Sequence, residues 1–149
     1  MNNLYRTNKL VINALKQFYL QAIEGKKMFK NKNQIMIQFN KTLVQDDELP
    51  WEIVDAKVKR KIMSYNEDLM LVKVSFEQGG IGEIHKHPHL QISYIASGIF
   101  EITIGGEMKT LKDGDVFFVP SEVLHRAVCL EDGILIDVFN PMREDFVHN

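Results

Sequence analysis

The 149-residue chain lacks most features that mark secreted, membrane or nucleic-acid-binding proteins. It has one cysteine, which excludes an internal disulfide and favours a reducing compartment, so we expect a cytoplasmic protein. The formal charge is only −2, so no basic excess suggests nucleic acid as a partner, and no block of like charge suggests a tail. Repeats, low-complexity segments and linkers are also missing. With 45% hydrophobic residues, the chain can form one domain with a sizeable core.

The one cysteine, Cys129, lies between Val128 and Leu130. A cysteine in such apolar surroundings is typical of a small buried packing residue. We therefore expect Cys129 in the core; the alternative is a catalytic thiol.

The first fifty residues form an N-terminal extension in which Leu10 to Ile23 has apolar residues at helical spacing. Polar residues interrupt this stretch and no small-residue cleavage site follows it, so a signal peptide is a poor fit, and the segment is too short and polar to span a membrane. We expect an amphipathic helix packed on the domain or on a second subunit. The alternative is that the residues before Met28 or Met36 are not native.

From Pro50-Trp51 onward the sequence predicts short strands separated by turn residues. Gly105-Gly106 is typical of a tight hairpin. We also expect one hairpin around Ser97-Gly98 and another around Glu131-Asp132. Strands at this spacing predict an all-β, single-domain jelly-roll barrel over residues 51–149. The predicted strands are 69–76, 91–95, 99–104, 107–111, 116–119, 125–130 and 133–139.

Histidines in two short windows predict a metal site. Side chains alternate along a strand, so His85 and His87 project from one face, and Gln91 and His125 complete a set of four ligands. Imidazole and amide oxygen suit a divalent transition metal. Because all four ligands are neutral, the set favours Lewis-acid work on an anionic or polyhydroxylated substrate over oxygen activation. The alternative for Gln91 is a hydrogen bond to a loop.

The remaining histidines have other expected places. His89 follows Pro88 and fits the ligand spacing less well than the pair before it, so we expect it beside the site rather than among the ligands. His148 lies near the end of the chain and is expected in solvent.

A second group of candidate residues lies near the C-terminal end. Asp137 interrupts an apolar strand and shares a face with Leu135 and Phe139, so a carboxylate there must be paired or functional. If that face is the barrel interior, Asp137 can act as a general acid or base, and Phe139 as a flat wall. Arg143 has a planar fork suited to a carboxylate. The alternatives are an Asp137–Arg143 pair, simple packing of Phe139, and a surface salt bridge from Arg143 to Glu144 or Asp145.

These residues resemble the two motifs of the cupin superfamily. The first motif is filled by Gly80 or Gly82, His85, His87, Gln91 and Gly98, and the second by Gly114, Pro120 and His125. The chain departs from the second motif at Glu122 and Cys129, neither of which is a metal-ligand position in the family. The resemblance implies a cupin jelly-roll barrel holding one divalent transition metal, with Ni, Zn, Mn and Fe all open.

A narrower likeness joins residues 137–146 to the pectin-degradation cupins, which ketonise unsaturated uronates. It implies that Asp137, Phe139 and Arg143 line the active site and that a small-molecule uronate is the substrate. The likeness covers roughly Trp51 to Phe146. Two alternatives stay open at this point, a metal-dependent cupin dioxygenase and a non-catalytic sugar-binding cupin. Because barrel edges and the Leu10 to Ile23 stripe need covering, we also expect a homodimer.

Overall fold

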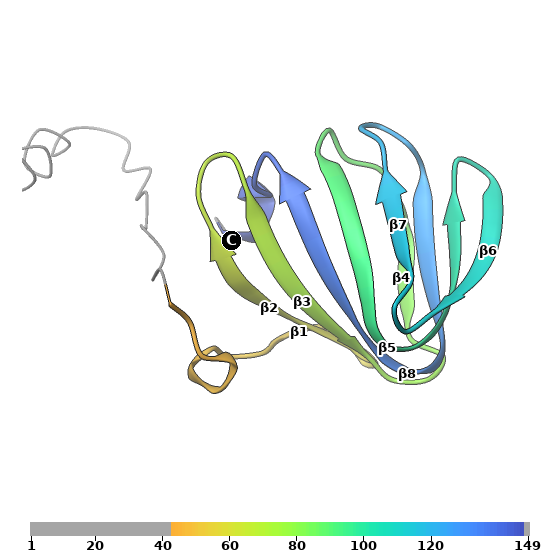
Figure 1. Cartoon of the computed structure of the whole chain (residues 1–149), viewed down its shortest axis with the longest axis horizontal. Coiled ribbons are helices and arrows are strands. Elements are labelled where there is room, and N and C mark those ends of the chain that lie inside the picture. The colour runs from red at the N-terminus through yellow and green to blue at the C-terminus, as the bar shows by residue number, and fades with distance from the viewer. Residues whose placement is uncertain (1–42, 148–149) are drawn as a thin grey trace, which may run out of the picture. The chain divides into compact units, whose positions relative to one another are not determined.

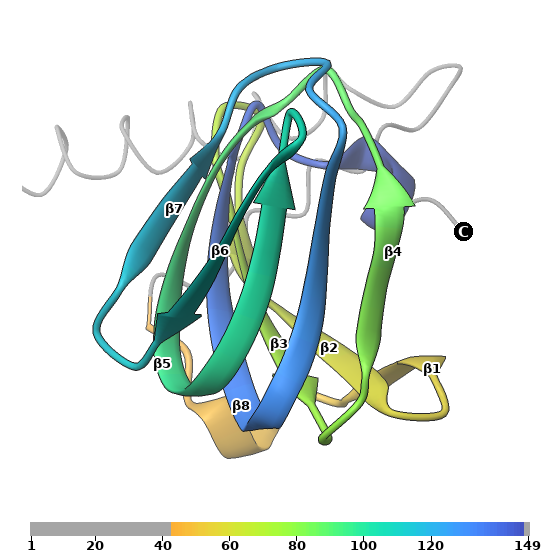
Figure 2. The same cartoon turned by 90° about the vertical axis from the view of Figure 1, so that its right-hand side faces the viewer.

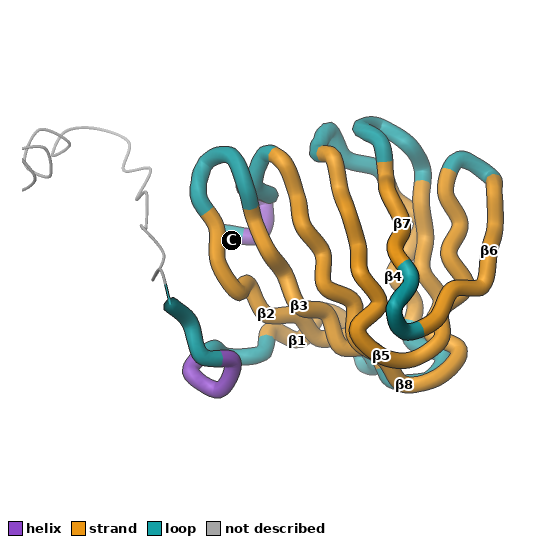
Figure 3. Tube along the Cα trace, viewed as in Figure 1, coloured by secondary structure: helices purple, strands orange, loops and turns teal. Residues whose placement is uncertain are grey.

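The computed structural model describes residues 43–147, which form an antiparallel β-structure with two short 3-10 helices (Figures 1 and 3). The strands lie in the order β1-β2-β3-β8-β5-β6, while β4 also pairs with β8 and β7 with β5. Within this part of the chain no helix is long and apolar enough to cross a membrane. The elements are η1 (Asp46–Glu48), β1 (Glu52–Asp55), β2 (Val58–Tyr65), β3 (Met70–Phe76), β4 (Ile81–His85), β5 (Leu90–Ile104), β6 (Glu107–Lys112), β7 (Val116–Val119), β8 (His125–Asn140) and η2 (Glu144–Phe146).

Two of the predicted hairpins are wrong, because β5 and β8 are each one long strand. They pair antiparallel along their whole length, from Leu90 opposite Asn140 to Ile104 opposite His125, and each bends back on itself (Figure 2). The bend falls close to where the hairpins were expected, at Gly98 in β5 and at Gly133, the residue after Asp132, in β8. A Cβ on Gly98, whose φ is +88°, would lie 2.6 Å from Asp132 O, and one on Gly133 would lie 2.5 Å from Ser97 O. The missing side chains let the two backbones approach closely, so the ladder turns a corner without reversing the chain.

The other strand predictions are confirmed within a residue of their ends. β7 occupies the predicted range, while β3 begins one residue later than expected and β6 ends one residue later. Gly105 and Gly106 have φ of 59° and 91° and join Ile104 of β5 to Glu107 of β6. Positive φ at both loop residues is the signature of a two-residue hairpin whose twist matches that of its strands.

The main apolar core lies inside the bent β5–β8 ladder. Phe100 is fully buried and meets Phe76 edge to face, with ring centroids 5.4 Å apart. Cys129 is 1% exposed in the same cluster, and burial raises the pKa of its thiol, so the expected packing role is confirmed. The cluster consists of Val58, Phe76, Ile95, Phe100, Ile102, Cys129 and Leu135.

The predicted N-terminal helix at Leu10 to Ile23, and His148, lie outside the described residues. Residues just before the predicted boundary at residue 50 already contact the barrel, because Asp46 forms ion pairs with Lys61 of β2 at 3.3 Å and Lys73 of β3 at 3.0 Å. The division of the chain at residue 50 stays a prediction, and so does the homodimer.

Candidate metal centre

Three histidines from two strands and a loop meet at one end of the barrel. His85 ends β4 and lies opposite His125, the first residue of β8. His87 lies in the loop after β4, so the expectation that both residues of the pair sit on one strand is wrong for His87. Pro88 has no backbone N–H to donate to a ladder, which accounts for a loop here. The rings still converge: a ligand atom from each of the three lies within 4.8 Å of the other two.

The backbone sets the tautomer of each of these rings. Nδ1 of His85 lies 2.7 Å from Glu83 O, that of His87 3.0 Å from His89 O, and that of His125 2.9 Å from Val123 O. A carbonyl oxygen only accepts, so each Nδ1 carries the proton and donates it. With Nδ1 as the donor, Nε2 of each ring is left to face the group as a ligand atom, which is the arrangement of histidines that ligate metals.

Gln91 lies beside the three histidines and is held there by a chain of buried hydrogen bonds. Its Nε2 donates to Ser93 Oγ at 2.9 Å, and Ser93 Oγ donates to Asp137 Oδ1 at 2.6 Å. Its Oε1 lies 3.0 Å from His87 Nε2. The amide oxygen and the ring nitrogen are then both lone-pair atoms facing each other. The loop hydrogen bond considered as an alternative for Gln91 is not what its side chain makes among the described residues.

A divalent cation fits these donors. Two ligand atoms ~2.1 Å from one metal at a right angle lie about 3 Å apart, as Gln91 Oε1 and His87 Nε2 do. His125 Nε2 is buried, and no hydrogen-bond partner for it lies in the described part of the chain. Burial lowers the pKa of His87 and lowers that of His125 to about 4, so both rings are neutral at physiological pH, as metal binding requires. Gln91 as the fourth ligand stays a prediction.

A cavity of about 430 Å³ lies inside the barrel and reaches this group. Leu135, Asp137 and Phe139 share the interior face of β8, as predicted, and each is at most 8% exposed. Burial raises the pKa of Asp137 to about 6, although the hydrogen bonds from Ser93 and Gln91 and the charge of Arg143 oppose the shift. The predicted site residues His85, Gln91, His125, Asp137, Phe139 and Arg143 all line the cavity.

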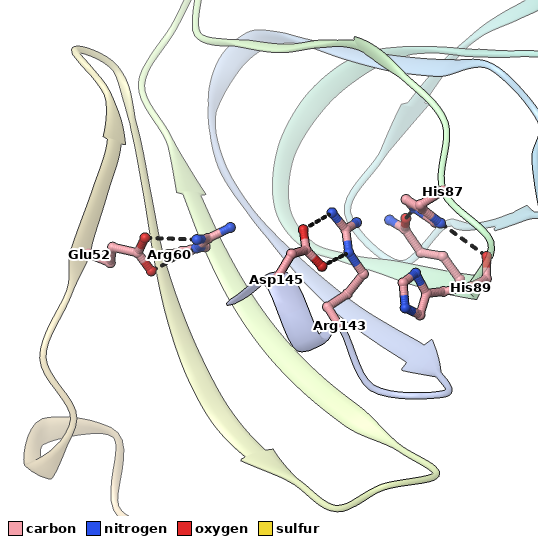
Figure 4. A network of polar contacts seen from close by, with 7 residues as sticks. Glu52, Arg60, His87, His89, Arg143 and Asp145 are labelled. Carbon is pink, nitrogen blue, oxygen red and sulfur yellow. Dashed lines mark hydrogen bonds and ion pairs between the residues drawn. The ribbon is translucent and has the colours of Figure 1, made fainter. Parts of the chain in front are cut away.

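Arg143 is held in place by three neighbours, of which Figure 4 shows Asp145. Its Nε and Nη2 donate to the two carboxylate oxygens of Asp145 at 2.9 and 2.7 Å, and this pairing lowers the pKa of Asp145. Its guanidinium carbon lies 4.3 Å from the centroid of the Phe146 ring and 5.5 Å from that of Phe139. The alternative salt bridge to Asp145 is thus present, yet the arginine side chain is only 11% exposed and also lines the cavity. Asp137 pairs with Ser93 instead of Arg143.

Sequence reasoning missed two residues of this region. Ser93 has the strand parity of Gln91, a signal that could have placed it on the interior face. Arg60 of β2 also lines the cavity, and its guanidinium carbon lies 3.8 Å from the centroid of the Phe146 ring while Glu52 binds it at 2.7 and 2.8 Å (Figure 4). No sequence pattern links Arg60 to Phe146, because they meet only through packing.

His89 lies where it was expected, beside the histidine group and outside it. Its ring centroid is 5.5 Å from that of His87, and its carbonyl is the acceptor for His87 Nδ1. It belongs neither to the three converging histidines nor to the cavity lining.

Comparison with known proteins identifies the family. Residues 72–139 match the cupin domain. Over 104 residues the chain is 48% identical to the pectin degradation protein KdgF of Dickeya dadantii (strain 3937), an alignment that covers 68% of this chain and 94% of the relative. The chain belongs to the cupin family. The cupin resemblance inferred from the two histidine motifs, and the all-β jelly-roll fold that it implied, are therefore confirmed.

Solved structures of other cupins have the same fold. An RmlC-like cupin from Shewanella frigidimarina NCIMB 400 superposes with a TM-score of 0.70 at 41% identity, covering 72% of this chain and 96% of that one. KdgF from Halomonas sp. superposes with a TM-score of 0.69 at 38% identity, covering 72% of this chain and 99% of that one.

Proposed function

We propose that this protein is a metal-dependent cupin enzyme that converts 4,5-unsaturated monouronates, released from pectin or alginate by lyases, into linear ketonised forms. One observation carries the proposal: a cavity in the barrel brings a buried carboxylate, Asp137, close to three histidines and an amide oxygen that suit a divalent metal. The similarity to KdgF, a pectin degradation protein in Dickeya dadantii, supports the substrate class.

The cavity has the size and lining that a small acidic sugar needs. Its volume of about 430 Å³ is within the range of small-molecule sites. Phe139 offers a flat apolar wall for a sugar ring, and Arg143 beside it is a planar cation for the carboxylate. Asp145 neutralises Arg143 in the free protein, so substrate binding would shift or share that pairing.

The reaction is an isomerisation, so it needs no oxidant or second substrate. The hemiacetal hydroxyl gives up its proton, the ring carbon–oxygen bond breaks, and the former ring oxygen takes up a proton, which leaves an aldehyde and an enol. The enol oxygen then loses its proton while the neighbouring carbon gains one, which gives the ketone. Asp137 would take a proton from oxygen and return one to carbon, while Arg143 and Phe139 hold the acid group and the ring in place.

The histidines and Gln91 would hold the metal of this reaction. When bound, a divalent metal would supply a Lewis acid for negative charge developing on substrate oxygens, undiminished by its neutral ligands. Such substrates also open spontaneously in water, so a modest acceleration of ~100- to 10,000-fold from one placed acid–base group is sufficient.

The test is loss of the ultraviolet absorbance of the carbon–carbon double bond, with and without protein, on unsaturated monouronates prepared with a pectate or alginate lyase. We expect a rate above the spontaneous one that disappears after chelation and returns with added metal. A rate equal to background on every such uronate would defeat the proposal. Oxygen uptake in the same assay would instead favour a dioxygenase.

A further inference from the structure

Ser93 lies in the interior between Gln91 and Asp137 and is hydrogen-bonded to both, and its place follows from strand register. Gln91 and Ser93 are two residues apart on β5, so their side chains leave the same face. Ser93 lies directly opposite Asp137 of β8, and it is fully buried. The hydroxyl therefore connects the amide to the carboxylate with no access for water.

The proton count at Ser93 determines which end of the Gln91 amide faces the histidines. A serine hydroxyl has one proton, and here it is donated to Asp137 Oδ1. Toward Gln91 the hydroxyl can then only accept, so it takes a proton from Nε2. Oε1 is left pointing at His87 Nε2. The opposite orientation of the amide would present Nε2 to the metal, and an amide nitrogen has no lone pair to give.

We propose that Ser93 is a positioning residue that holds the Gln91 amide with its oxygen toward the three histidines, and thereby turns Gln91 into a metal ligand. The inference rests on the metal centre of the proposed function, and it does not depend on which sugar is the substrate. Partners of this kind, hydrogen-bonded to a ligand and not to the metal, typically contribute 10- to 100-fold to affinity, so we expect about that range here.

The role can be separated from simple packing by asking whether the effect depends on an amide at position 91. A carboxylate has two oxygens, so Gln91→Glu has no wrong end to present. If Ser93 acts by orienting the amide, Ser93→Ala should matter in the wild-type background and much less in the Gln91→Glu background. If Ser93 only fills space, the loss should be the same in both backgrounds.

The experiment is a titration of Co²⁺ into metal-free protein. Binding is measured by calorimetry and by the visible absorption of the bound ion. Wild type, Ser93→Ala, Ser93→Thr, Gln91→Glu and the Ser93→Ala/Gln91→Glu double variant are compared, with thermal unfolding to verify the fold of each. Ser75→Ala, at a half-buried strand serine outside the cavity lining, is the matched control.

We expect Ser93→Ala to weaken Co²⁺ binding by ~10- to 100-fold and to change the spectrum of the bound ion. Ser93→Thr, which retains the hydroxyl, and Ser75→Ala should bind like wild type. In the Gln91→Glu background the loss should shrink to about twofold, the usual limit of additivity. Unchanged affinity in Ser93→Ala, or an equal loss in both backgrounds, overturns the inference. Uronate turnover is not measured here, so a failure of the proposed substrate would leave these results unaffected.

Discussion

The two halves of the β5–β8 ladder bury very different side chains on the same interior face. Past the corner at Gly98 and Gly133, Phe100, Ile102 and Cys129 fill the interior with apolar atoms. Toward the other end the interior face also buries polar side chains, because Gln91, Ser93 and Asp137, each no more than 8% exposed, lie there beside Ile95, Leu135 and Phe139. The strands, the pairing and the degree of burial are shared, so the difference lies in the side chains.

The free energy of burial is favourable for the apolar side chains of one half and unfavourable for the polar side chains of the other. Apolar atoms gain free energy when removed from water, whereas each polar group loses it unless a partner is present. The polar half meets that condition with two consecutive hydrogen bonds, from Gln91 through Ser93 to Asp137, while Gln91 Oε1 and His87 Nε2 face each other as lone-pair atoms suited to a metal. A fold would not retain such a costly row for stability, so its position marks the functional end of the barrel. Four changes would break or sharpen this contrast.

The largest effect is expected from His125→Ala. Losing one of the converging nitrogens opens the site, so purified protein that otherwise holds about one divalent metal per chain should lose it. Elemental analysis measures this directly. His89→Ala is the matched control, because its ring lies next to the group without belonging to it, and that variant should keep its metal. Equal metal content in both variants would contradict the assignment.

In the apolar half, Phe100→Ala should lower the free energy of unfolding by ~3–5 kcal/mol, because it leaves a cavity beside Phe76. Urea unfolding measures the loss. Below its midpoint the folded variant should still bind metal, since the ring that Phe100 packs against is that of Phe76, which is not one of the converging histidines. Loss of metal from protein that remains folded would mean that the two halves are not independent.

In the polar half, Asp137→Asn should lower activity and leave the stability of the fold unchanged. It retains size and hydrogen bonding but removes the basic group, so turnover of the unsaturated uronate should fall by ~100-fold or more. Metal content and the urea midpoint should stay close to those of wild type. Full activity in this variant would make Asp137 structural and remove the mechanistic basis of the proposed function.

The smallest of the four effects is expected at Arg143. Arg143→Ala should weaken uronate binding by ~1.5–3 kcal/mol, the range for a lost charge-assisted hydrogen bond, and should raise KM more than it lowers kcat. Asp145→Asn is the opposite control, because it releases the guanidinium group from its present partner and should not weaken binding. If both variants bind the uronate like wild type, the carboxylate is held elsewhere, with Arg60 as the next cation to replace.

Much of this architecture could be predicted from local patterns. Turn residues and apolar alternation marked β3, β6 and β7, and the spacing of two motifs identified which histidines would converge. The breaks expected at Ser97-Gly98 and Glu131-Asp132 lie at or next to the corner at Gly98 and Gly133, but they were interpreted wrongly as hairpins. A glycine at a break indicates that the backbone needs unusual freedom, and that need is the same whether the chain reverses in a hairpin or continues around a bend.

The sequence by itself indicated the family and the three histidines through two motifs, and a shared face for Leu135, Asp137 and Phe139, because each motif is local and a strand has a fixed period. Only the tertiary structure showed which other residues contact them. The register of β5 against β8 places Ser93 opposite Asp137, and the packing of η2 against β2 brings Phe146 to Arg60. Those contacts join segments that are 44 and 86 residues apart, and no local pattern encodes the register or the packing that brings such segments together.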